Sequence, residues 1–92
     1  MKKPNAKLDL DQTALSFVAL TDPDSHARWD AVRKLVDQAT LIKIAETDAD
    51  SNVRWQATYQ LTDQTVLNRI AIGDSNADVR RLASCLTGRI EQ

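Results

Sequence analysis

Residues 37–62 read DQATLIKIAETDADSNVRWQATYQLT, and this stretch decides the fold because the chain repeats it on both sides. Its opening Asp-Gln pair recurs 26 residues earlier at Asp11 and 26 residues later at Asp63. Aligned without gaps, residues 11–36 match residues 37–62 at 12 of 26 positions, and residues 37–62 match residues 63–88 at 9. The chain therefore contains three units of one repeat, which we number 1 to 3.

Each unit predicts two short helices. In the first half of unit 2, Leu41, Ile44 and Ala45 recur at helical spacing, and in the second half Val53 and Ala57 do the same. The chain has eleven Asp but only two Glu, and Asp favours helix starts over helix interiors. We therefore expect a helix to begin after each of six N-cap residues: Asp11, Asp24, Asp37, Asp50, Asp63 and Asn76.

The composition predicts a single domain of 92 residues with no membrane segment and no disulfide. No apolar run approaches the roughly 20 residues that cross a bilayer, residues 1–12 lack the apolar core of a secretory signal, and Cys85 is the only cysteine. The 12 Lys and Arg balance 13 Asp and Glu, which argues against nucleic acid as a partner. We expect a cytoplasmic protein in which residues 1–10 form an N-terminal cap or tail. Residues 86–92 would close the array, with 89–92 as a tail.

The repeated pattern L-x-x-[IV]-A-x-x-D-x-x-x-x-[VA]-R-x-x-A, which unit 2 carries from Leu41 to Ala57, resembles the HEAT-repeat family. The resemblance covers about residues 11–88. The 26-residue unit is similar to the short HEAT-like units of phycobilisome-lyase-type proteins and to the variant leucine-rich repeats of bacteria. It implies an all-α fold, a right-handed α-solenoid of three helix pairs.

The resemblance also implies a structural ladder between neighbouring units, made by an Asp in the turn and an Arg six residues later. An Arg guanidinium can bridge a carboxylate and turn carbonyls at once. The alternative is a set of exposed ion pairs worth about 0–1 kcal/mol each. The ladder pairs in this sequence are Asp22 with Arg28, Asp48 with Arg54, and Asp74 with Arg80.

The second helix of each unit is expected to turn its largest side chains away from the core. A rotation of about 100° per residue places Trp29 opposite Ala27 and Ala31. The same rule gathers five residues of the types enriched at binding hot spots, which we take as the candidate partner-binding set: Trp29, Arg33, Trp55, Tyr59 and Arg81. Two interpretations stay open for the tryptophans, a groove for a protein or peptide and a shield over a core of small residues.

Phe17 also falls away from the core, on the first helix of unit 1. It is expected to be covered by Leu8 and Leu10, or otherwise to mark an oligomer contact.

The sequence predicts no catalytic chemistry, no cofactor and no metal site. The only histidine, His26, is expected in the first turn of a helix without a nucleophile beside it. The paired acids at Asp22 and Asp24, and at Asp48 and Asp50, lack the EF-hand spacing and its closing Glu. Cys85 has no basic neighbour except Arg81 to activate it, so we expect an inert thiol.

These observations favour a non-enzymatic interaction or scaffold module that binds a protein or peptide on the concave face of a short solenoid. It would be a monomer or a weak homo-oligomer. Family resemblance also allows DNA binding, for which the expected face is nearly neutral. A role as an accessory protein of the phycobilin-lyase type rests on that resemblance alone.

Overall fold

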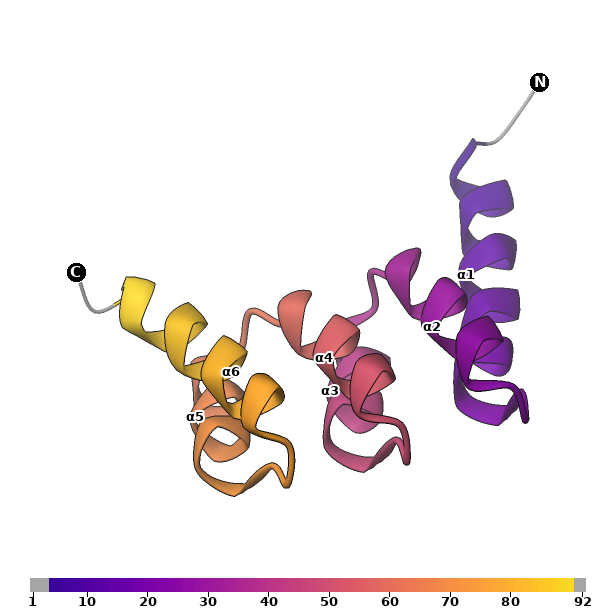
Figure 1. Ribbon diagram of the computed structural model, residues 1–92. Helices are drawn as coiled ribbons and strands as arrows, with labels where there is room; N and C mark the ends of the chain where they lie inside the picture. Colours follow the sequence, from indigo (N-terminus) through magenta and orange to yellow (C-terminus); the bar gives the residue numbers. More distant parts are fainter. Residues whose placement is uncertain (1–3, 91–92) are drawn as a thin grey trace.

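A computed structural model describes the backbone of residues 4–90 and the side chains of residues 11–88. Within these limits the protein is all-helical, as predicted, with six helices and no strand (Figure 1). None of these helices is long and apolar enough to cross a membrane. The helices are α1 (Pro4–Thr21), α2 (Ser25–Arg33), α3 (Gln38–Thr47), α4 (Ser51–Tyr59), α5 (Gln64–Gly73) and α6 (Ala77–Ile90).

The six helices form three pairs that stand side by side in chain order (Figure 1). Each first helix packs against the second helix of its own unit, and α4 packs between α2 and α6. The Cα atoms extend over 46 × 33 × 14 Å, so the row of pairs is long and thin. The second helices therefore share one broad face of the row, which we call the second-helix face.

Five of the six predicted N-caps are confirmed. The carboxylates of Asp24, Asp37, Asp50 and Asp63 each accept a hydrogen bond from a backbone N–H in the first turn of the following helix. Asn76 does the same for α6 with its side-chain oxygen, which accepts from the N–H groups of residues 78 and 79. These acceptors satisfy donors that a helix start otherwise leaves unpaired.

The prediction for Asp11 is wrong, because Asp11 lies inside α1. No turn residue separates Pro4 from Thr21, and proline suits the first position of a helix, where no N–H is needed. Residues 4–10, expected as an N-terminal cap or tail, are helical and continue directly into residues 11–21. At the other end α6 continues to Ile90, so residues 89–90 of the expected C-terminal tail are helical.

The core lies between the two layers of helices and is made of aliphatic side chains. Leu41, Ile44 and Val53 of unit 2 are at most 2 % exposed, as are Leu67 and Val79 of unit 3. Small residues at the inner positions of the second helices, such as Ala31, Ala57 and Ala83, let the helices approach closely. This packing holds the second helices in place and leaves their outer sides free.

Candidate binding surface

Each pair of neighbouring units is joined by an Arg–Asp contact. At the joint between units 1 and 2, Arg28 donates from Nε and Nη2 to the two carboxylate oxygens of Asp48, at 2.9 and 3.0 Å. Its Nη1 donates to the backbone carbonyl of Asp22 at 2.9 Å. The side chains of Arg28 and Asp48 are 14 % and 7 % exposed, so this bidentate pair is largely removed from water.

The joint between units 2 and 3 repeats this geometry. Arg54 donates to the carboxylate of Asp74 at 2.9 and 3.1 Å and to the backbone carbonyl of Asp48 at 2.9 Å. The expected pairing of each Arg with the carboxylate six residues earlier is therefore corrected. That Asp offers its backbone carbonyl instead, while its carboxylate accepts the N–H of the residue two positions later in the turn. The guanidinium reaches the carboxylate of the next unit.

Asp74 feels two opposing effects. Burial alone would raise the pKa of this carboxyl, but hydrogen bonds from Arg54 and from the N–H of Asn76 lower it. The positive charges of Arg54 and Arg80 act in the same direction, and together they hold the pKa of Asp74 below its ordinary value of 3.8. Asp74 is therefore ionised at neutral pH, and the joint relies on that charge.

The Gln of the first two Asp-Gln pairs has a role that the sequence did not predict. Gln38 donates to the carbonyl of Gln60 at 3.0 Å and accepts from the N–H of Thr62 at 3.1 Å, which secures the connection after α4. Gln12 holds the connection after α2 in the same way. The repeated Gln was visible in the alignment, but its partners lie 22–24 residues away, in the connection that follows the next helix.

On the second-helix face, Trp29 lies between two neighbours on its own helix. The imidazole of His26 stacks on it, with ring centroids 5.6 Å apart and an angle of 24° between planes, and the guanidinium of Arg33 lies 5.0 Å from its ring centroid. Trp29 is half-buried and packs against the core. It therefore contributes to the shielding interpretation as well as to the surface.

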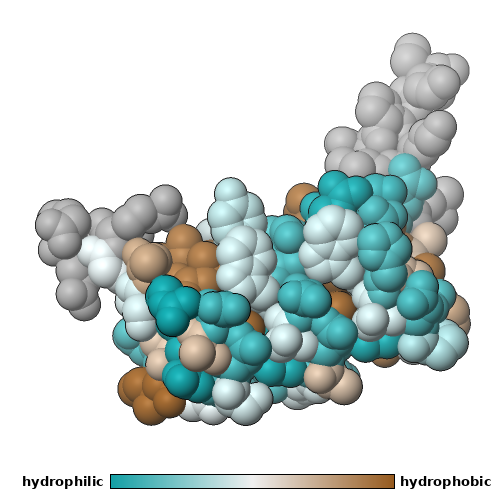
Figure 2. Space-filling view, viewed as in Figure 1, coloured by the Kyte–Doolittle hydropathy of each residue, from teal (hydrophilic) through white to brown (hydrophobic). Residues whose placement is uncertain are grey.

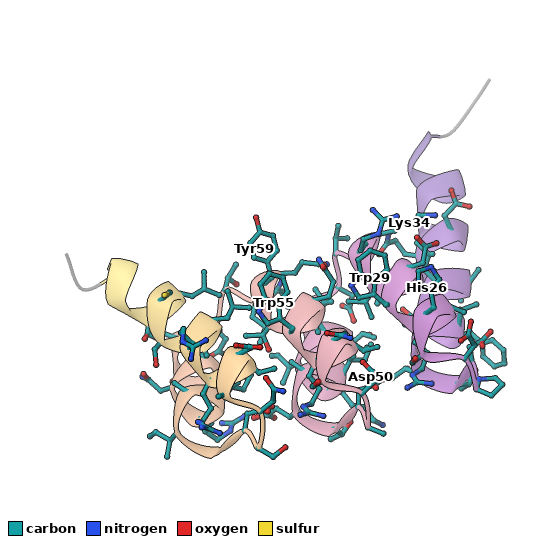
Figure 3. The ribbon with its side chains drawn as sticks, viewed as in Figure 1. His26, Trp29, Lys34, Asp50, Trp55 and Tyr59 are labelled. Atoms are coloured by element: carbon teal, nitrogen blue, oxygen red, sulfur yellow. The ribbon has the colours of Figure 1, made fainter. Side chains whose placement is uncertain are left out.

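Trp55 occupies the same position one unit later and is more open, with 37 % of its surface exposed. It stacks on Tyr59, with centroids 5.7 Å apart and planes within 6° of parallel, and Tyr59 is 58 % exposed. Figure 3 shows Trp29, Trp55 and Tyr59 on the same side of the row. The three aromatic residues of the candidate set thus share one surface.

Two open grooves run between the second helices on this face. The first lies between α2 and α4, has a volume of about 420 Å³, and is bounded by Trp29 on one side and Trp55 on the other. The second lies between α4 and α6, has a volume of about 390 Å³, and is bounded by Trp55 and Arg81. Trp55 and Asn52 line both grooves, so they form the ridge between them.

The two arginines of the candidate set already have acidic neighbours. Arg33 pairs with Asp30 at 2.7 Å, and Lys34 approaches the same carboxylate at 3.4 Å. Arg81 pairs with Asp78 at 2.8 Å, and both side chains are at least 70 % exposed. The face is therefore close to electrically neutral, and in Figure 2 hydrophilic residues cover most of it around the pale aromatic ones.

Phe17 is 69 % exposed on α1. The cover expected from Leu8 and Leu10 lies outside the side chains that the structure describes. Cys85 is an exposed free thiol on α6 that lines the second groove. Among residues 11–88, no group of three His, Cys, Asp or Glu side chains is placed to hold a metal ion.

No protein-family model, no curated protein and no solved structure matches this chain.

Proposed function

We propose that the chain is a short HEAT-like α-solenoid, right-handed and built from three 26-residue helix pairs, that binds a peptide segment of a protein partner without catalysis. The binding site is the second-helix face. The observation that carries the proposal is the pair of grooves one unit apart that share Trp55 as their common ridge. Trp29 and Trp55 occupy the same position in successive units, so a ligand with regularly spaced side chains suits this surface.

A peptide in the polyproline II conformation has a matching period. Neighbouring packed helices lie about 8–10 Å apart, and a polyproline II chain advances about 3.1 Å per residue with three residues per turn. A peptide of this conformation that crosses the second helices therefore presents every third side chain to a groove. Asn52 on the ridge carries both a donor and an acceptor, which together match one peptide group of such a chain.

The two grooves favour different side chains. The first is flanked by the indole rings of Trp29 and Trp55, which suit an apolar side chain. The second is flanked by Trp55 and by Arg81, whose highly exposed pair with Asp78 is easily exchanged for a carboxylate of the ligand. The preferred sequence is an apolar residue with an acidic residue three positions away.

A displayed library of random 12-residue peptides tests this proposal. Selection on the wild-type protein is expected to enrich peptides with an apolar residue and an acidic residue three positions apart. A synthetic peptide from that pool should lose at least about tenfold in affinity for Trp55→Ala by isothermal titration, because Trp side chains at the centre of a contact carry much of its energy. Phe17→Ala, an exposed aromatic on α1, serves as the matched control and should bind normally.

Two results contradict the proposal. One is enrichment of the same peptides on Trp55→Ala, which would mean that the ridge is not part of the site. The other is tight DNA binding with a steep salt dependence, which would favour the nucleic-acid alternative. The paired state of Arg33 and Arg81 argues against this second result.

A further inference from the structure

The two ends of the row carry complementary halves of the contact that joins the units. Arg80 donates from Nη1 to the carbonyl of Asp74, as Arg28 and Arg54 do in their own turns, but among residues 11–88 no carboxylate receives the rest of its guanidinium. At the other end the carboxylate of Asp22 accepts an N–H in its own turn, and within the same range no arginine reaches it. One end thus offers a guanidinium and the other a carboxylate.

The register of these ends matches that of the internal joints. Each internal joint links an Arg to the Asp that follows it by 20 residues. The position 20 residues after Arg80 would be number 100, beyond the third unit. Counting back three units of 26 residues gives position 22, so the equivalent residue is Asp22 of a following copy. A second copy that continued the row would therefore bring Asp22 to Arg80 as Asp74 is brought to Arg54.

A second contact on the first-helix side points to the same arrangement. At the joint of units 2 and 3, Glu46 accepts from Arg69, 23 residues later, at 2.8 and 3.1 Å. At the joint of units 1 and 2, the equivalent residues Leu20 and Lys43 line one groove between α1 and α3. The residue that follows Ile72 by the same 23 positions, in the next copy, is Phe17.

Ile72 and Phe17 are also among the most exposed large apolar side chains of the protein. Ile72 is 83 % exposed at the end of α5, and Phe17 is 69 % exposed on α1. The two ends lie at opposite extremes of the molecule, so they cannot cover each other within one chain (Figure 1). In a joint between two copies, Ile72 and Phe17 would form an apolar contact at the positions where Glu46 and Arg69 form an ion pair in the internal joint.

We propose that the chain binds a second copy of itself head to tail, with Arg80 and Ile72 of one copy meeting Asp22 and Phe17 of the next. The contact is heterologous, so it continues into longer rows instead of closing as a symmetric dimer. It is weaker than an internal joint, because Ser84 offers a smaller side chain to the contact than its fully buried counterparts Val32 and Thr58. This surface is separate from the second-helix face.

The test exchanges the apolar pair for the ion pair of the internal joint. Phe17→Arg and Ile72→Glu are made singly and together in the full 92-residue chain, and association is followed by sedimentation velocity from about 10 µM to about 1 mM. Because both positions are exposed, each variant should keep its helical content by circular dichroism. Val36→Arg, at a side chain that is also 69 % exposed but lies between α2 and α3, is the matched control.

The wild type and Val36→Arg are expected to associate as concentration rises. Each end variant alone should associate at least about tenfold more weakly. A 1:1 mixture of the two single variants contains one unchanged apolar joint and one Arg–Glu joint, so it should recover association. The double variant should recover association that weakens with salt. The proposal is overturned if the wild type stays monomeric, if only one of the two end substitutions matters, or if the mixture does not recover.

Discussion

Units 2 and 3 share a sequence pattern but differ in how their second helices end. In unit 2, α4 stops at Tyr59, and Gln38 holds the connection that follows. In unit 3, α6 continues to Ile90, and the hydrogen bond that Gln64 donates within residues 11–88 goes to the nearby carbonyl of Thr62 at 3.4 Å. The Gln of an Asp-Gln pair therefore secures a connecting segment only where the chain turns from one unit into another.

The same contrast holds for the joints. Arg54 has a carboxylate in front of it because unit 3 follows, whereas Arg80 keeps only its carbonyl contact within residues 11–88. Identical residues therefore make different contributions in the two units. The contribution depends on the neighbour that packs against them, which is how stability is distributed in repeat proteins.

The largest difference is expected between Asp74→Ala and Asp22→Ala. Both carboxylates accept an N–H from their own turn at 2.8 Å, but only Asp74 also receives an arginine. The pair is largely but not fully buried, so its loss falls between the values for exposed and buried pairs. Asp74→Ala should lower the free energy of unfolding by about 2–3 kcal/mol more than Asp22→Ala in urea denaturation. Equal losses would mean that the joint contributes no stability.

Acid should weaken the same joint, with a smaller effect than the deletion. The pKa of Asp74 is lowered in the folded protein, so its contribution is complete above the ordinary value of 3.8 and is lost as the pH falls through the folded pKa. A protonated carboxyl still accepts a hydrogen bond, which limits the loss. Between pH 5 and pH 2, the free energy of unfolding should therefore fall less steeply with pH in Asp74→Asn than in the wild type. Equal pH dependence in the two proteins would exclude Asp74 as a source of the acid sensitivity.

A smaller effect is expected from the glutamine clamps. Gln38→Ala removes three hydrogen bonds from the connection after α4 and should cost about 1–2 kcal/mol of unfolding free energy. Gln64→Ala removes one long bond and should cost less than about 0.5 kcal/mol. Thermal denaturation of the two variants side by side measures this difference. A larger loss at Gln64 would contradict the role of Gln38 as the clamp.

The smallest effect concerns the extension of α6. Gly88 lies inside this helix, and nothing lies within 4 Å of an added Cβ. Gly88→Ala should therefore stabilise the protein by up to about 0.5 kcal/mol, because alanine loses less backbone entropy in a helix. A destabilised variant would mean that the chain turns at this point as it does after α4. Chemical denaturation with duplicate preparations resolves a change of this size.

The amino-acid sequence predicted the helices well because their signals are local. Asp24 and Asn76 act on N–H groups two or three residues away, so spacing alone identifies them as caps. It predicted the joints incompletely, because Arg28 finds its carboxylate 20 residues further on, across a packing contact that no local pattern encodes. The α1 extension before Asp11 was missed because the Asp-Gln alignment marks the unit and not the helix.

The candidate surface followed from helical periodicity, which placed Trp29 and Trp55 on one side of their helices. Periodicity does not tell how far neighbouring helices lie from these rings, so the grooves on either side of Trp55 could not be predicted. It also could not separate the two tryptophans. Trp29 packs against the core while Trp55 is more open, because Trp29 is covered by His26 and Arg33.

The most direct test of peptide binding is a two-dimensional NMR titration of the labelled protein with the peptide selected from the library. The indole N–H signals of Trp29 and Trp55 should shift first, together with backbone amides on α4 near Asn52. Signals from α1, α3 and α5 should stay in place. Shifts confined to those first helices, with both indole signals unchanged, would contradict binding at the second-helix face.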